Sequence, residues 1–264
     1  MNQRVGRKRR IEDALQCDLR AWNHDPAKAR ALRPKTRYAF CILANVFHDV
    51  SMLQRLIYSS DPPKDAPNHI AAAQLAQTVS LVRMLGGKLW EARLRMNDAV
   101  LSKELRTEFF PLQDGSADVW RTLNREIGGA KWLDRMRNAH AFHYPTFAQI
   151  GNALEKHWPN DGSTIFGNTQ RSAFFHSADV ALLLAFFASA TDDDSTRDPR
   201  AMLNSFAPIL RELYALSMVL ISLLGDVLGA FVHQRLYDGG LPIPLGNISG
   251  PSEDDLFIPY FLKR

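Results

Sequence analysis

The sequence lacks the features expected of a secreted or disulfide-stabilised protein. Only two cysteines occur among the 264 residues, Cys17 and Cys41, and no pairing motif joins them. Two isolated cysteines are typical of free thiols in a reducing compartment. The basic N-terminus is not followed by an apolar stretch with a small-residue cleavage site, which argues against a secretory signal. These absences predict a cytoplasmic protein.

Long hydrophobic runs are also missing. The longest uncharged stretch near the C-terminus runs from Leu213 to Gly225, where Asp226 interrupts it. This stretch is shorter than the run of about 18–20 apolar residues that a membrane crossing needs. It therefore predicts a buried helix of a soluble protein, with no membrane segment.

Familiar metal and cofactor motifs are absent as well. The sequence has no HExxH, no paired CxxC and no glycine-rich phosphate loop. His140 and His143 stand three apart, but no neighbouring carboxylate or cysteine completes a metal-ligand set. The acids of the 192–194 run are contiguous, whereas calcium loops alternate their acids. We therefore expect neither a metal nor a cofactor.

Positive charge is concentrated near the N-terminus. Residues 1–37 contain eleven Lys/Arg and four Asp/Glu, a balance of +7, whereas the rest of the chain has a balance of −3. The densest run is Arg7, Lys8, Arg9 and Arg10. Such a segment can attract an RNA backbone or an anionic membrane, and it can equally be a solvated terminus. We interpret residues 1–35 as a basic N-terminal arm.

Most of the remaining chain has the apolar spacing of amphipathic helices. The pattern predicts helices over 38–59 and 68–105, the second with a kink or a close helix crossing at Gly86-Gly87, and further helices starting near Ser116 and Lys131. A proline-rich loop between the first two helices predicts an antiparallel hairpin. Internal repeats and convincing strand patterns are lacking. The predicted fold class is all-α, a multi-helix bundle with long antiparallel helices.

The C-terminal half continues the helical pattern. Helices are expected over 178–190 and 200–236, and Pro208 should kink or split the second one. Gly225 and Gly229 stand four apart, which permits close helix packing within the monomer or at a dimer seam. Residues 241–264 contain four prolines and predict an irregular tail. The helical domain thus covers residues 36–240.

The residues best suited to chemistry follow the helix start near Lys131. Residues 137–145 read RNAHAFHYP, which sets an arginine, an amide and two histidines before a proline that should end the helix. Arginine binds phosphate through a fixed fork of donors, and histidine moves protons near neutral pH. Together these groups could cut a phosphodiester without a metal.

This arrangement resembles the HEPN superfamily, whose motif joins an arginine and a small polar residue to a histidine near a helix end. HEPN proteins are helical bundles associated with nucleotides and RNA in toxin, phage-defence and RNA-processing systems. The resemblance covers nine residues and the helical context, and implies a metal-independent endoribonuclease with its site at a homodimer interface. It gives phosphate binding to Arg137, positioning to Asn138 and proton transfer to His143. An antitoxin-like or accessory protein is a further partner that it allows.

Other residues fit the motif too. On an ideal helix, positions six apart differ by about 240°, so Arg137 and His143 converge only if the helix loosens or a partner subunit completes the site. His140 lies on nearly the same face as Arg137. Arg171 and His176 form a second pair with the loosest spacing of the motif.

The same residues also have a structural interpretation. Arg137 could pair with Asp134 one turn back, and His143 could be a core histidine on the helical stripe of Trp132 and Met136. The chain would then be a non-catalytic helical interaction or accessory protein.

Overall fold

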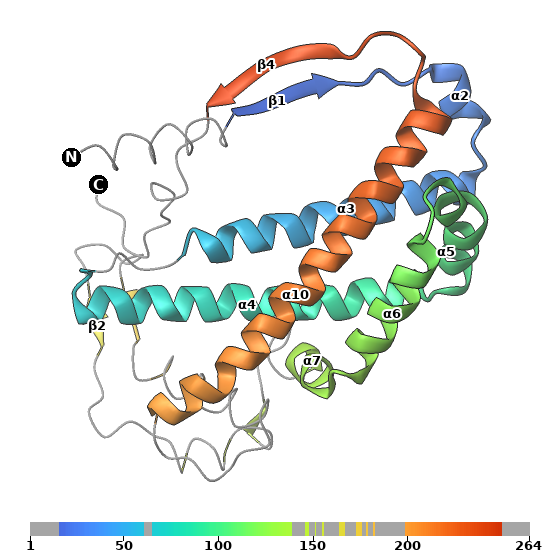
Figure 1. The fold of residues 1–264 in the computed structure, drawn as a ribbon. Coiled ribbons are helices and arrows are strands. Elements are labelled where there is room, and N and C mark those ends of the chain that lie inside the picture. Colours follow the sequence, from blue (N-terminus) through green and yellow to red (C-terminus); the bar gives the residue numbers. More distant parts are fainter. Residues whose placement is uncertain are drawn as a thin grey trace, which may run out of the picture.

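The computed structural model describes residues 16–60, 65–138 and 199–249, together with 146–147, 151, 155, 164–166, 173–175, 178 and 182. The fold is all-α, as the sequence predicts. α3 (Pro34–Tyr58) and α4 (Asn68–Met96) lie side by side, and α10 (Pro199–Phe231) crosses them (Figure 1). The shorter helices pack beside these three long helices (Figure 1).

α3 and α4 form the predicted antiparallel hairpin (Figure 1). α4 ends at Met96 rather than at residue 105, because Asp98 caps a separate helix, α5 (Ala99–Glu104). The Asp98 carboxylate accepts hydrogen bonds from the backbone nitrogens of Val100 and Leu101, at 3.0 and 3.3 Å. A side-chain cap of this kind stabilises a helix start. It divides the apolar stretch that the sequence pattern treats as one helix.

α4 is buried over much of its circumference around its two adjacent glycines. Leu85, Gly86 and Gly87 are all buried, and consecutive residues on a helix point about 100° apart, whereas Met84 on the remaining face is exposed and Lys88 is partly exposed. Gly86 lies against α7 (Lys131–Met136), where an added Cβ would overlap the Met136 sulfur. The predicted close crossing is therefore confirmed, and α4 continues through it as one helix.

Short helical elements connect α5 to α7. A π-helical turn, η1 (Leu105–Phe109), and a 3-10 turn, η2 (Phe110–Leu112), lead to α6 (Ser116–Gly129). α6 starts at Ser116 as predicted, although Ser116 is a buried residue of the first turn and does not cap the helix with its side chain. Gly115 precedes the helix with a φ of 78°, a conformation that favours glycine.

α10 packs against α3 in the opposite direction. The Phe231 ring stacks on Phe40 of α3 and on Phe109, with centroids 5.5 and 4.4 Å apart. Farther along both helices, Gln54 Nε2 donates a hydrogen bond to Ser217 Oγ. The helix continues through Pro208, so the predicted split does not occur, and it ends in the π-helical turn η5 (Val232–Leu236).

Two short strand pairs accompany the helices. β1 (Gln16–Ala21) pairs antiparallel with β4 (Ile243–Ser249), and β2 (Ile165–Phe166) pairs antiparallel with β3 (Ala173–Phe174). The apolar spacing of the sequence indicates neither pair. Part of the predicted arm, which also contains α2 (Pro26–Ala31), is therefore paired with part of the predicted irregular tail. Residues 1–15 and 250–264 lie outside the described residues.

Two helical segments are long and apolar enough to span a bilayer by length and composition alone. They are Pro34–Tyr58, with a mean hydropathy of 1.2, and Ala207–Leu236, with 2.1. Within the most apolar 18-residue stretch of each segment, 17% is buried in Pro34–Tyr58 and 39% is buried in Ala207–Leu236. Core helices of soluble proteins pass the same test, so length does not assign them to a membrane.

We expect Gly86→Ala to destabilise the fold by about 1–3 kcal/mol, because the added methyl group overpacks the contact with Met136. The better helix propensity of alanine, about 1 kcal/mol, offsets only part of this cost. Gly129→Ala is the matched control, since a Cβ there meets no atom within 4 Å. Urea unfolding measures both variants. Equal stability of the two would contradict the close α4–α7 contact.

Candidate functional site

Arg137 and Asn138 follow directly on α7, which is held by two longer helices. The inner face of α7 is buried through Trp132, Leu133 and Met136. Trp132 Nε1 also donates a hydrogen bond of 2.9 Å to Glu212 Oε2 on α10. The Arg137 side chain is 34% exposed. The first two residues of the motif therefore stand at the surface on a packed support.

The guanidinium of Arg137 is oriented by two neighbours. Its Nε donates to Oε1 of Glu91 on α4 at 2.8 Å, and its Nη2 lies 2.8 Å from the same oxygen. Its Nη1 donates to Asn138 Oδ1 at 2.7 Å. Among the described residues, Nη1 has one N–H that meets no acceptor, and Nη2 has only the ion-pair contact with Glu91. N–H groups of this kind can donate to a phosphate oxygen.

Asn138 connects Arg137 to Asp134. The Asn138 Nδ2 donates to Asp134 Oδ1 at 3.0 Å, one turn back along the chain. The direct Arg137–Asp134 pair considered in the sequence analysis is replaced by this indirect link, because Glu91 lies at the guanidinium instead. With one amide atom accepting and the other donating, Asn138 helps to orient the guanidinium. Its predicted positioning role in catalysis stays a prediction.

Charges of both signs surround this cluster. Glu91 contacts the guanidinium and Asp134 contacts Asn138 beside it, and these two carboxylates weaken the attraction of Arg137 for an anion. Lys88 and Arg95 flank Glu91 at three and four positions along α4, the spacing of neighbours on one helix face. Lys88 Nζ lies 2.7 Å from an Asp49 carboxylate oxygen of α3. Arg95 is exposed and adds positive charge beside the site.

A hollow of about 260 Å³, lined by both charged and apolar side chains, opens between α3 and α4. Its polar lining consists of Asn45, Asp49, Lys88, Glu91 and Arg95. Glu91 belongs both to this hollow and to the Arg137 contact, so the two features adjoin. Sequence reasoning missed them. The signal that could have found them is the charged stripe of Lys88, Glu91 and Arg95 on one face of a predicted helix.

The other predicted site residues lie outside the described residues. They are His143, the rivals His140, Arg171 and His176, and the basic run Arg7, Lys8, Arg9 and Arg10. The structure thus brings together Arg137 and Asn138, and adds Glu91 to them. Within the described ranges, no group of three His, Cys, Asp or Glu side chains could hold a metal ion.

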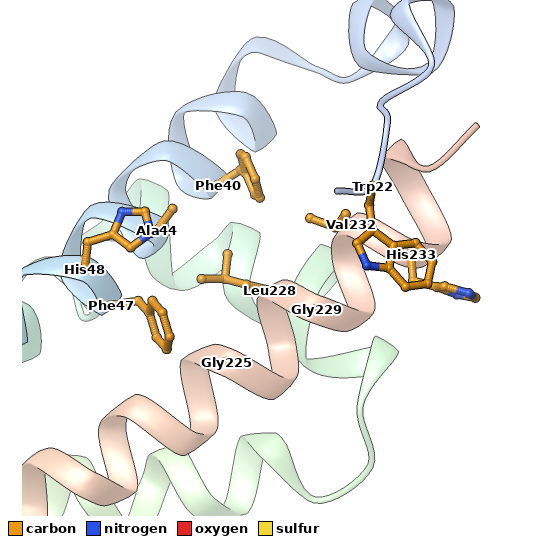
Figure 2. A pocket seen from close by; sticks show the side chains of 10 residues that line it. All are labelled: Trp22, Phe40, Ala44, Phe47, His48, Gly225, Leu228, Gly229, Val232 and His233. Carbon is orange, nitrogen blue, oxygen red and sulfur yellow. The ribbon is translucent and has the colours of Figure 1, made fainter. Parts of the chain in front are cut away.

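A second hollow of about 570 Å³ lies between α3 and α10 (Figure 2). Its lining is mainly apolar, with Trp22, Phe40, Phe47, Leu228 and Val232 among its residues. Two histidines, His48 and His233, are its ionisable groups. This composition suits an apolar contact better than a phosphate. The polar cluster at Arg137 is therefore the better candidate for RNA chemistry.

Comparisons with known proteins add no functional assignment. No family model matches the chain, and neither a curated protein nor a solved structure is significantly similar to it. The resemblance to HEPN proteins therefore depends on residues 137–145 and on the all-α fold.

We expect the Glu91–Arg137 pair to contribute little to stability, because both side chains are about one-third exposed. Exposed ion pairs typically contribute about 0.2–1 kcal/mol. A double-mutant cycle of Glu91→Ala and Arg137→Ala, measured by urea unfolding, should give a coupling below about 1 kcal/mol that falls as salt is added. A coupling above about 2 kcal/mol would instead show that Arg137 is mainly a structural residue.

Proposed function

We propose that this protein is a HEPN-like RNA-binding protein that cleaves RNA without a metal. The observation that carries the proposal is the orientation of the Arg137 guanidinium by Glu91 and Asn138, with the side chain still 34% exposed. A cation that is already oriented needs no rearrangement when a phosphate binds, which is the condition for strong transition-state stabilisation.

The proposed reaction is an internal transesterification. The ribose 2′-hydroxyl loses its proton and attacks the adjacent phosphorus, the bond from phosphorus to the 5′ oxygen breaks, and that oxygen takes up a proton. The products are a 2′,3′-cyclic phosphate and a 5′-hydroxyl end. Arg137 stabilises negative charge on the phosphate oxygens, an effect that is typically about 3 kcal/mol for one oriented donor.

Proton transfer is assigned to His143. A positioned acid or base contributes about 10²–10⁴-fold to the rate. The reaction needs one proton removed and one delivered, and a homodimer with paired motifs would supply two histidines for these steps. Asn138 keeps the guanidinium oriented through its contact with Nη1. The rivals His140 and the Arg171–His176 pair are alternatives for the same roles.

RNA attraction is assigned to the basic arm. Arg7, Lys8, Arg9 and Arg10 would supply attraction that depends on charge rather than on base sequence. The proposal further implies a cytoplasmic homodimer of a toxin or phage-defence system, with an antitoxin-like or accessory protein as a further partner.

A second candidate function is a non-catalytic helical interaction protein. Two observations favour it: Glu91 neutralises the charge of Arg137, and the surfaces of α3 and α10 retain exposed apolar residues. In this case residues 137–145 would be structural. RNA cleavage discriminates between the two functions.

We expect the purified protein to cleave mixed RNA in the presence of EDTA. Arg137→Ala and His143→Ala should each lower the cleavage rate by about 100-fold or more, the size of effect expected for an oxyanion donor or a general acid. Labelled RNA, gel analysis of fragments and detection of cyclic phosphate ends measure this.

Arg121→Ala is the control for the loss of an arginine. Arg121 is 78% exposed and pairs with Asp118 on α6, so its removal should leave cleavage unchanged. Arg171→Ala and His176→Ala test the rival pair, and His140→Ala tests the rival proton donor. Intact RNA at high protein concentration, or cleavage that survives both motif variants, would refute the proposal.

Deletion of residues 1–10 should make RNA binding weaker and less dependent on salt. Each lost contact with a single-strand phosphate lowers the slope of log affinity against log salt by about 0.7, so loss of Arg4 together with the four-residue basic run should change it by about 3.5 at most. Filter binding at several salt concentrations measures the slope. An unchanged slope would show that the arm does not contact the RNA backbone.

A further inference from the structure

A third hollow, of about 380 Å³, lies between α6 and the segment formed by α5, η1 and η2. Its volume falls within the range of about 300–1,000 Å³ that is typical of small-molecule sites. Its polar lining consists of Asn97, Ser102, Arg106, Arg121 and Asn124, and none of the described residues that line it is acidic. It shares no lining residue with the hollow beside Arg137.

Arg106 is the cation of this hollow that is left for a ligand. Its Nε donates to the backbone oxygen of Ser102 at 3.1 Å, and among the described residues no carboxylate pairs with its guanidinium. Arg121 is engaged instead, because its Nη1 lies 2.6 Å from Asp118 Oδ1. A guanidinium without an acidic partner attracts an anion, and its planar fork matches the two oxygens of a carboxylate.

Trp120 adds a neutral hydrogen-bond donor to the same lining. The residue is 8% exposed, and its indole N–H meets no acceptor among the described residues. The similarly buried Trp132 differs, since its Nε1 donates to Glu212 at 2.9 Å. A buried tryptophan usually finds an acceptor for this group. The N–H of Trp120 is therefore available to a ligand oxygen.

The amide oxygens of the hollow are already occupied. Asn97 Oδ1 accepts a hydrogen bond from Asn124 Nδ2 at 3.3 Å. Asn124 Oδ1 accepts from Asn97 Nδ2 at 2.7 Å and from Arg93 Nε at 3.1 Å. Oxygens engaged in this way repel an anion less than free ones do, and Asn124 Nδ2 keeps a second N–H. The polar lining therefore offers mainly donors.

Apolar side chains form the rest of the lining. Leu105 and Phe110 are buried, as Trp120 is. Two of these three side chains are aromatic, and aromatic rings stack favourably on one another. Leu105 and Arg106 belong to the π-helical turn η1, and such turns are frequent at functional sites. A ligand of this hollow therefore needs an aromatic body as well as an acceptor group.

The charge of the hollow selects the acceptor group. One guanidinium without an acidic partner matches a single negative charge, whereas a phosphomonoester carries nearly two at neutral pH. We infer that this hollow binds a small aromatic monocarboxylate, whose carboxylate is held by Arg106 and Trp120. This site goes beyond the proposed function, because it needs no RNA and uses none of residues 137–145.

Three matched probes test the site: 2-naphthoate, 2-naphthamide and 2-naphthyl phosphate. They share one ring system and carry a carboxylate, a neutral amide and a phosphate. Titration of the full-length protein, followed by NMR of the indole N–H signals, should give naphthoate a dissociation constant of about 1 mM or below. The Trp120 signal, assigned through its loss in Trp120→Phe, should move as the carboxylate binds. Naphthamide should bind about 10-fold more weakly or less, because it lacks the charge that strengthens the hydrogen bonds.

Substitutions in the lining separate the charge, the fork and the indole donor. Arg106→Gln should raise the dissociation constant of naphthoate by about 10-fold or more, the effect of losing a hydrogen bond between charged groups. Arg106→Lys keeps the charge without the fork and should lose less. Trp120→Phe keeps an aromatic ring without the donor and should cost about 5-fold.

Arg125→Gln is the matched control. Arg125 is an exposed arginine of α6 that does not line the hollow, so its removal should leave naphthoate binding unchanged. Circular dichroism verifies the helical fold of each variant.

Equal affinity for naphthoate and naphthamide would overturn the inference, and so would naphthoate binding that survives Arg106→Gln. A Trp120 signal that stays unchanged up to about 10 mM naphthoate would also overturn it. Tighter binding of naphthyl phosphate would assign the hollow to phosphate esters instead. RNA cleavage is measured separately through Arg137→Ala and His143→Ala, so each proposal can fail without the other.

Discussion

The burial of α4 is the constraint on which the rest of the structure depends. Three consecutive residues around Gly86 are buried, so neighbours must cover more than half of the helix circumference at that point. α3 covers one side, and α7 approaches the other closely only because Gly86 has no side chain. α7 in turn carries Arg137. The position of the candidate site therefore follows from a packing contact made a few residues before it.

α4 supports the candidate site and also reduces the positive charge of Arg137 there. Glu91 of α4 orients Arg137 and at the same time neutralises part of its attraction for phosphate. The ion pair is partly exposed, so water and salt weaken it and a phosphate can compete for the guanidinium. An oriented but incompletely neutralised arginine is suited to binding a charge that develops during a reaction. It is less suited to strong binding of an anion whose charge is already complete before the reaction.

α3 adjoins two hollows of different chemistry. The hollow shared with α4 has carboxylates and cations in its lining, whereas the hollow shared with α10 is mainly apolar. Oriented charge suits phosphate chemistry, whereas an apolar lining suits an apolar contact.

The helical class, the helix starts near residues 68 and 131 and the crossing at Gly86 could be predicted from the sequence, because periodicity and glycine act locally. The break at Asp98 was missed, although a capping aspartate is also a local signal. Arg137 and Asn138 were proposed from their chemistry and from the family resemblance, and their functional role stays a prediction. Only the tertiary structure decided that Glu91 binds Arg137, that β1 pairs with β4 from the opposite end of the chain, and which face of α10 stays open. Those outcomes depend on how helices pack on one another, and the pattern of a single helix does not specify its neighbour.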